Sequence, residues 1–167
     1  MHKRWMMISL AVLLQSGALW AGGDGPSAAK TEIDGKPITL ARYAKSFIGQ
    51  GNIRVDIAPY TQAGGEGAIL LFHGLEGDWD GKAINHSVET SSQGQTYKTS
   101  YKGKPWTTLL TRQSYDRMNY ELYSPGTKDP IALSPSDGAA QLTSPQQIYK
   151  EYRAQNEADK KKSVTTP

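Results

Sequence analysis

Short strand-like segments run from Gly51 to Leu133, separated by turn-forming residues at intervals of about 8 to 12 residues. This spacing is typical of antiparallel strands that follow one another through tight turns. Parallel strands need crossover connections of roughly a dozen residues or more, and no stretch of this region has room for one. The sequence therefore predicts an antiparallel meander of about five or six strands.

Alternation of apolar and polar residues identifies the strands. In the first, Ile53, Val55 and Ile57 face one way, while Arg54 and Asp56 face the other. The same period of two recurs in residues 82–90, 96–101, 106–112 and 118–123. In residues 106–112 the alternation aligns Trp106, Thr108 and Leu110. The continuous apolar run from Ala68 to Phe72 predicts a strand that is covered on both faces.

A helix is expected on each side of this sheet. Before it, Thr39 is a candidate cap for a short helix whose apolar residues recur at helical spacing. These residues are Leu40, Tyr43, Ala44 and Phe47, with Arg42 and Lys45 on the polar side. Gly49 and Gly51 would end it. The fold class predicted from this pattern is α+β.

A second helix follows the sheet. Ser144 to Gln147 form a capping box with Pro145 at the first helical position. Ile148, Tyr149 and Tyr152 provide an apolar stripe, which we expect to dock on the sheet and which fades by Glu157. Residues 158–167, with their lysine cluster, are expected to be a disordered tail. Residues 32–157 would then form a single globular domain.

The start of the chain has the order of a secretory signal peptide over residues 1–21. Lys3 and Arg4 precede an apolar run, and small residues follow it. The run is shorter than the roughly 20 residues that span a bilayer as a helix. Cleavage is expected after Ala18 or Ala21, with Ala21 preferred, and residues 22–31 would be a flexible leader. The predicted location is the periplasm or the outside of the cell, and no membrane segment is expected after signal removal.

Cysteine is absent from the chain, which excludes disulfides, thiol catalysis and cysteine-based metal sites. Loss of Lys3 and Arg4 with the signal peptide would leave 17 basic against 16 acidic residues. No basic face is apparent in the folded region, so we expect no nucleic-acid partner.

The segment AILLFHGLEGDWDG, from Ala68 to Gly81, admits three interpretations. An apolar strand before His-Gly is how the oxyanion segment of α/β-hydrolases begins, but the Gly-x-Ser-x-Gly elbow that such enzymes need is missing. Alternating acids at Glu76, Asp78 and Asp80 echo a calcium loop, but Ser87 occupies the position where a bidentate glutamate is expected. A strand and its Asp-Gly turn is the interpretation we favour.

Four aromatic residues are the predicted binding residues: Trp79, Tyr97, Tyr101 and Trp106. Large amphipathic rings serve both cores and interfaces. Trp79 lies in a polar turn, where it either folds back onto the core or contacts a partner. The predicted function is non-enzymatic binding of a protein or a cell-envelope component, such as a glycan, in the manner of an inhibitor or immunity protein. No cofactor and no metal are expected, and the oligomeric state is left open.

The alternative is a small hydrolase or metal-dependent enzyme that uses His73, Asp78, Asp80 and His86. The two histidines belong to neighbouring predicted strands, and an aspartate could complete a metal site. The two hypotheses differ in geometry, because the enzyme requires both imidazole rings and a carboxylate to converge in one pocket.

Overall fold

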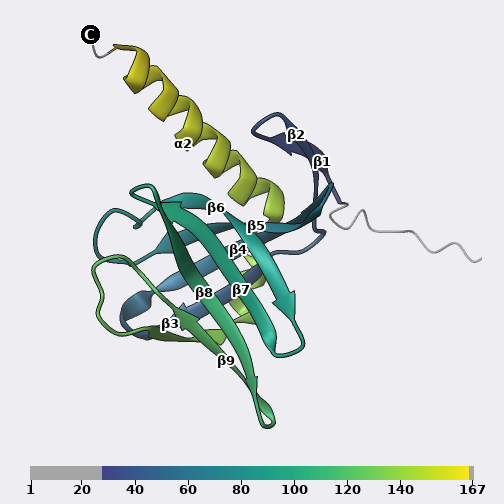
Figure 1. Ribbon diagram of the computed structural model, residues 1–167, viewed down its shortest axis with the longest axis vertical. Coiled ribbons are helices and arrows are strands. Elements are labelled where there is room, and N and C mark those ends of the chain that lie inside the picture. The colour runs from purple at the N-terminus through teal and green to yellow at the C-terminus, as the bar shows by residue number, and fades with distance from the viewer. Residues whose placement is uncertain (1–27, 166–167) are drawn as a thin grey trace, which may run out of the picture.

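Eight strands of this protein close into a barrel in which each strand pairs with the next along the chain and the last pairs with the first (Figure 1). The computed structural model describes residues 28–165. The barrel strands are β3 (Lys45–Gly49), β4 (Arg54–Gln62), β5 (Gly65–His73), β6 (Ala83–Ser91), β7 (Gly94–Tyr101), β8 (Lys104–Ser114), β9 (Arg117–Leu122) and β10 (Ile131–Pro135). A short 3-10 helix, η1 (Gln50–Asn52), links β3 to β4.

The barrel closes at the seam between β10 and β3, where Leu133 pairs with Gly49 and Pro135 with Phe47. The predicted antiparallel sheet with a C-terminal helix is confirmed. The prediction of about five or six strands is wrong, because the sheet contains ten strands and eight of them close on themselves. Alternation within a segment shows a strand and its two faces, whereas closure depends on the pairing of segments that are far apart in the chain.

The predicted N-terminal helix is also wrong. Its residues belong to β2 (Lys36–Leu40), a linker at residues 41–44 and the start of β3. Leu40 pairs with Tyr60 and Phe47 pairs with Val55, so both flanks of the linker are held by β4. The helical spacing of the apolar residues is outweighed by these strand pairings.

The strands β1 (Lys30–Ile33) and β2 form a hairpin that extends the sheet from the far end of β4. In Figure 1 this hairpin stands at one side of the barrel, next to the C-terminal helix. β1 begins at Lys30, so the last residues of the expected flexible leader are part of a strand. The predicted signal peptide lies outside the described residues.

The main core lies inside the barrel. Its strand residues alternate with outward-facing neighbours, as the period of two requires. The buried members are Phe47, Val55, Ile57, Ala68, Leu70, Phe72, Leu75, Trp79, Tyr97, Leu109, Leu122 and Leu133.

One strand departs from simple alternation. Tyr97 pairs with Leu109 while Lys98 pairs with Thr107, so Thr108 is an extra residue at a bulge in β8. The bulge places Leu109 in the barrel core, so the predicted alignment of Trp106, Thr108 and Leu110 does not continue along the strand.

A second core lies outside the barrel wall, where α2 (Pro145–Thr165) packs against β4, β5 and β6. Ile148 is fully buried and Tyr152 is buried, while Lys150, Glu151 and Arg153 are exposed. The docked apolar stripe is therefore as predicted. The Ser144 hydroxyl accepts a hydrogen bond from the Gln147 amide at 3.2 Å, as expected of a helix cap.

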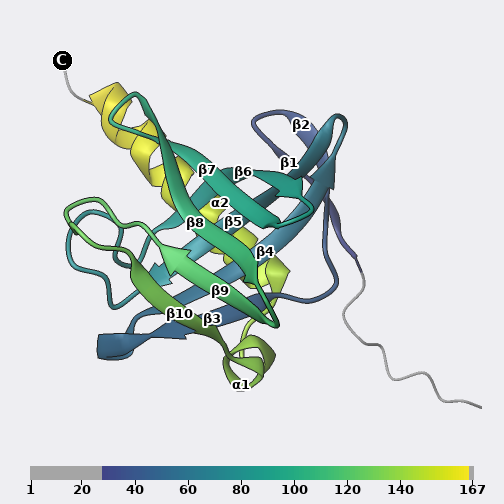
Figure 2. The same ribbon diagram turned by 60° about the horizontal axis from the view of Figure 1, so that its bottom comes forward.

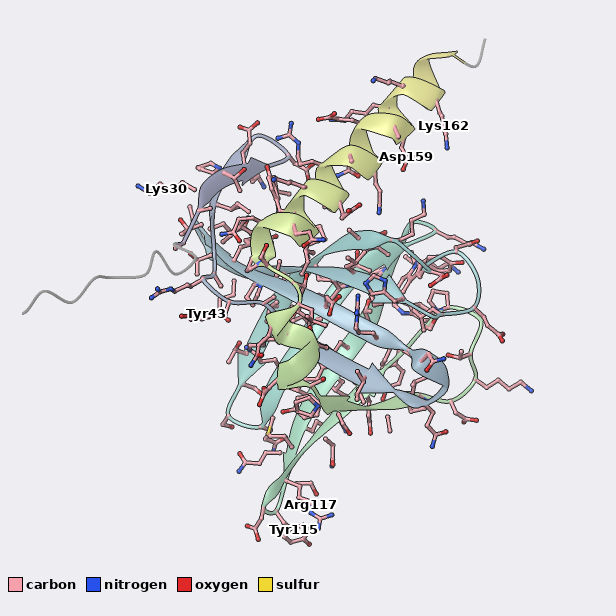
Figure 3. The ribbon with its side chains drawn as sticks, turned by 180° about the vertical axis from the view of Figure 1, so that it is seen from behind. Lys30, Tyr43, Tyr115, Arg117, Asp159 and Lys162 are labelled. Carbon is pink, nitrogen blue, oxygen red and sulfur yellow. The ribbon has the colours of Figure 1, made fainter. Side chains whose placement is uncertain are left out.

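The helix α2 continues to Thr165, beyond Glu157 and through most of the segment expected to be a disordered tail. Figure 3 shows its distal half, with Asp159 and Lys162, projecting past the barrel. A shorter helix, α1 (Asp137–Gln141), begins at a Ser136 cap and lies beside β3 and β10 (Figure 2).

Candidate functional site

Trp79 closes one end of the barrel. The loop between β5 and β6 folds back so that the Trp79 side chain is only 5% exposed. Its ring stacks on Phe72 with the centroids 5.3 Å apart, and it meets Tyr101 and Trp106 edge-on at 5.8 and 6.5 Å. Trp79 therefore folds back onto the core, which is one of the two positions expected for it from the sequence.

The four predicted binding residues do not form one surface. Tyr97 is buried inside the barrel and donates its hydroxyl to Gln95 Oε1 at 3.0 Å. Tyr101 and Trp106 are half-buried beside Trp79. Trp106 Nε1 donates to the Tyr123 carbonyl at 2.9 Å, which fixes the indole. A recognition role for the exposed parts of Tyr101 and Trp106 stays a prediction.

The loop from Gly74 to Lys82 is a turn between two strands. The Gly81 amide donates to the Phe72 carbonyl at 2.9 Å, and the Lys82 amide donates to the Trp79 carbonyl at 3.1 Å. Asp78 and Asp80 are exposed, and the Asp78 carboxylate accepts the Tyr101 hydroxyl at 3.2 Å. The favoured interpretation, a strand and its turn, is confirmed.

The two histidines lie on opposite faces of the barrel wall. His73 follows the interior residue Phe72 and therefore points outward, whereas His86 lies inside and contacts the Phe72 ring edge-on at 6.3 Å. They do not converge on a common carboxylate. Within residues 28–162, no group of three or more histidines and carboxylates is placed to hold a metal ion.

His86 is held as a neutral imidazole in the barrel core. Its Nδ1 lies 2.8 Å from the Ile84 carbonyl, which can only accept, so Nδ1 carries the proton. Nε2 is then free to accept the Thr108 hydroxyl at 2.9 Å. Burial lowers the pKa of His86 to about 4, against a smaller raising effect of the Ile84 hydrogen bond.

His73 belongs to a polar cluster on the outer wall that the sequence pattern did not reveal. Its Nε2 lies 3.2 Å from Asp56 Oδ2 and 3.2 Å from Arg54 Nη2. The Asp56 side chain is 1% exposed and accepts the Ser46 hydroxyl at 2.6 Å. Arg54 Nε lies 3.1 Å from Asp56 Oδ2 but lacks the alignment of a hydrogen bond.

This cluster does not have the arrangement of an activated serine. A nucleophilic serine needs a general base at its hydroxyl, but the Ser46 hydroxyl is donated to Asp56, and His73 contacts Asp56 instead of Ser46. The buried carboxylate is satisfied by groups from β3, β4 and β5, so the cluster ties these three strands together. The sign of it in the sequence was the pair of charged residues, Arg54 and Asp56, on one face of the alternating segment 53–57.

A pocket of about 460 Å³ lies at the end of the barrel opposite Trp79, beneath the linker between β2 and β3. We call it the mouth pocket, and its lining includes Arg42, Tyr43, Lys45, Pro59, Thr61, Glu66, Ala68, Val88, Gln95 and Tyr97. Pro59, Ala68, Val88 and Tyr97 lie on the interior faces of their strands. The pocket is therefore continuous with the barrel interior, and its size lies in the range of roughly 300–1,000 Å³ that suits small ligands.

A chain of hydrogen bonds crosses one side of this pocket. Tyr97 donates to Gln95, the Gln95 amide donates to Thr90 Oγ1 at 3.3 Å, and the Thr90 hydroxyl donates to Glu66 Oε2 at 3.1 Å. Burial, with a smaller effect of the nearby Glu66 charge, raises the pKa of Tyr97 to about 12. The Tyr97 hydroxyl is thus neutral, and its proton is already donated to Gln95.

The other side of the mouth pocket carries two cations, Arg42 and Lys45. The Arg42 guanidinium lies 5.4 Å from the centroid of the Tyr43 ring. Within the described part of the chain, neither cation forms an ion pair with a carboxylate. The helical spacing in the sequence puts both on the polar side of a helix, so their position at a barrel opening follows only from the strand pairing.

A larger hollow of about 780 Å³ lies on the seam between β3 and β10. Asp129 is the one charged residue in its lining, and the other lining residues come from β3, η1, Ile53 directly after η1, β10 and the loop before β10. The mouth pocket is the stronger candidate site, because it combines interior apolar walls with charged groups at its rim.

Among the described residues, no helix combines the length and the apolar character needed to cross a membrane. Comparisons with protein-family models, with curated proteins and with solved structures yield no match for this chain.

Proposed function

We propose that this chain is an exported, non-enzymatic binding protein that holds the apolar part of an envelope component in the mouth pocket. The observation that carries the proposal is the pocket itself. Pro59 of β4 and Val88 of β6 are partly exposed at this end, above the buried Ala68 and Tyr97, while Trp79 fills the other end. Concave, mostly apolar sites with a few polar groups at the rim are the usual form of ligand sites.

The arrangement of titratable groups favours binding over catalysis. His73 and His86 lie on opposite faces of the wall, and His86 is enclosed by its two hydrogen bonds. Neither imidazole lines the mouth pocket. The alternative enzyme built on His73, Asp78, Asp80 and His86 would need these groups to meet at one substrate, and their positions give it no support.

The proposed location is the periplasm or the exterior, on the basis of the signal-like first segment. Mass spectrometry of the mature protein should show a start between Leu19 and Asp24. A soluble species that retains Met1 would contradict export by this route.

Binding is tested with a neutral apolar fluorophore, N-phenyl-1-naphthylamine, whose emission rises when it leaves water. We expect saturable binding to the wild type and loss of binding in Val88→Trp, because an indole at this position fills the pocket. Thr61→Trp, at the exposed rim, is a second filling variant for the case that Val88→Trp does not fold. Circular dichroism checks the fold of both.

The matched control is Ile48→Trp, which places the same ring in the hollow on the seam. It should leave probe binding unchanged. Absence of saturable binding to the wild type, or loss of binding only in Ile48→Trp, would overturn the proposal.

A further inference from the structure

We propose that the ligand of the mouth pocket is an amphipathic anion, with an apolar chain or ring inside the barrel and a carboxylate or phosphate group at Arg42 and Lys45. This inference rests on the proposed binding function and goes beyond it by naming the chemical class of the ligand.

The charges around the mouth pocket are distributed unevenly. Arg42 and Lys45 come from the linker and the start of β3, and neither has a carboxylate partner among the described residues. Glu66 stands on β5 and is already hydrogen-bonded to Thr90. An anion is therefore attracted to the linker side and repelled from the β5 side, which gives it one orientation.

The Arg42 guanidinium is partly positioned before any ligand binds. It lies over the Tyr43 ring at 5.4 Å, within the range of a cation–π contact. A guanidinium presents a planar fork of donors that matches both carboxylate and phosphate oxygens, and Lys45 adds a second positive charge. This pair of side chains suits an acidic head group better than a neutral or cationic one.

The inner part of the pocket offers little to a polar ligand. Pro59, Ala68 and Val88 present apolar atoms, and the Tyr97 hydroxyl is already donated to Gln95. Polar groups of a ligand placed here would lose water without gaining partners, which is unfavourable. An apolar chain or ring therefore fits the interior, and the acidic group stays at the rim.

Tyr43 adds apolar surface at the rim. Its side chain is 64% exposed, and Figure 3 shows it pointing away from the body of the protein. A ring in this position can cover the part of a ligand that leaves the barrel. This apolar contact should act on charged and neutral ligands alike, whereas the contact of the ring with Arg42 favours anions.

The experiment uses the mature protein and four probes with the same decyl chain: undecanoate, decyl phosphate, decanol and decyltrimethylammonium. Each is titrated as a competitor of the neutral fluorophore at constant ionic strength. We expect undecanoate or decyl phosphate to bind at least about tenfold more tightly than decanol, as one charge-assisted contact would produce. The decyltrimethylammonium ion should bind more weakly than decanol. The better of the two anions identifies the head group.

The test variant is the double substitution Arg42→Gln with Lys45→Gln. It should weaken binding of the preferred anion about tenfold and leave decanol unchanged, because only the charged contact is lost. The control is Lys36→Gln with Lys104→Gln, which removes the same charge from exposed positions outside the pocket. Tyr43→Ala should weaken all four probes, and the anions most, because the Arg42 guanidinium also loses its contact with the ring.

Equal binding of the anions and decanol would overturn this inference while leaving the proposed binding function intact. An equal loss of anion binding in the control double variant would also overturn it, because the effect would then come from net charge. Failure of every probe, including the neutral fluorophore, would instead reject the mouth pocket as a binding site.

Discussion

Trp79 stacks on Phe72 with a centroid separation of 5.3 Å and an interplanar angle of 29°. Phe72 ends the buried part of β5, and Trp79 reaches back to it from the following turn, so one contact links the turn to the barrel interior. The indole thereby replaces water at one end of the barrel and leaves the opposite end as the candidate binding site.

Replacing Trp79 with alanine should lower the free energy of unfolding by about 3–5 kcal/mol, since a buried indole and its ring contacts are lost. Urea denaturation followed by circular dichroism measures this change. Tyr115→Ala is the control, because this ring is 97% exposed at the tip of the β8–β9 hairpin, as Figure 3 shows. It should change stability by less than about 0.5 kcal/mol. Similar losses in both variants would show that Trp79 does not close the barrel.

Gly67 should resist replacement by alanine for a packing reason. It pairs with Tyr60 across β4 and β5, and an added Cβ would overlap the Tyr60 ring. Tyr60 is held in place because its hydroxyl donates to Asn85 Oδ1 at 2.7 Å. Gly67→Ala should therefore cost about 1–3 kcal/mol in chemical denaturation, as overpacking does. In Gly138→Ala the new methyl group meets no atom, so this control should be close to neutral.

The buried His86 should make stability depend on pH. Its pKa is about 4 in the folded protein and about 6.5 in the unfolded chain. Between these values the unfolded chain takes up a proton that the folded protein does not, so acid favours unfolding. The stabilisation is fully present above pH 6.5 and is lost as the pH falls to about 4, at about 1.4 kcal/mol per pH unit and about 3 kcal/mol in total.

Chemical denaturation of the wild type and His86→Gln at several pH values isolates this contribution. Between about pH 4 and 6.5, the unfolding free energy of the wild type should fall more steeply with acid than that of His86→Gln. The difference between the two slopes should correspond to the uptake of one proton on unfolding. Identical slopes would show that His86 is accessible to water or charged in the folded state. Thr108→Val should leave the imidazole Nε2 without its donor and cost about 1–3 kcal/mol at neutral pH.

Docking of α2 should depend on its first half. Ile148 is fully buried between the helix and the barrel wall, so Ile148→Ala should cost about 2–5 kcal/mol. Deletion of residues 160–167 should change the unfolding free energy by less than about 0.5 kcal/mol, because the described side chains there are exposed. Thermal and urea unfolding compare the two. A loss from the deletion as large as that from Ile148→Ala would assign the end of α2 to the stable domain.

Much of the local structure was predictable from the sequence. The alternation in residues 53–57 shows which side chains enter the core, and the absence of crossover segments shows that the strands are antiparallel. The capping box at Ser144 and the stripe of Ile148 and Tyr152 show where α2 begins and which face it buries. These features depend on neighbours within a few residues, so local physical chemistry is sufficient for them.

The tertiary structure alone decided how these pieces meet. Closure requires β10 to pair with β3, whose residues are about 85 positions apart, and no local period indicates that pairing. The same closure turns His73 and His86 to opposite faces and brings Arg42 and Lys45 to a barrel opening instead of the polar side of a helix. The segment 40–47, whose spacing suits a helix, is strand at both ends because β4 offers it backbone partners on both sides of the linker at 41–44.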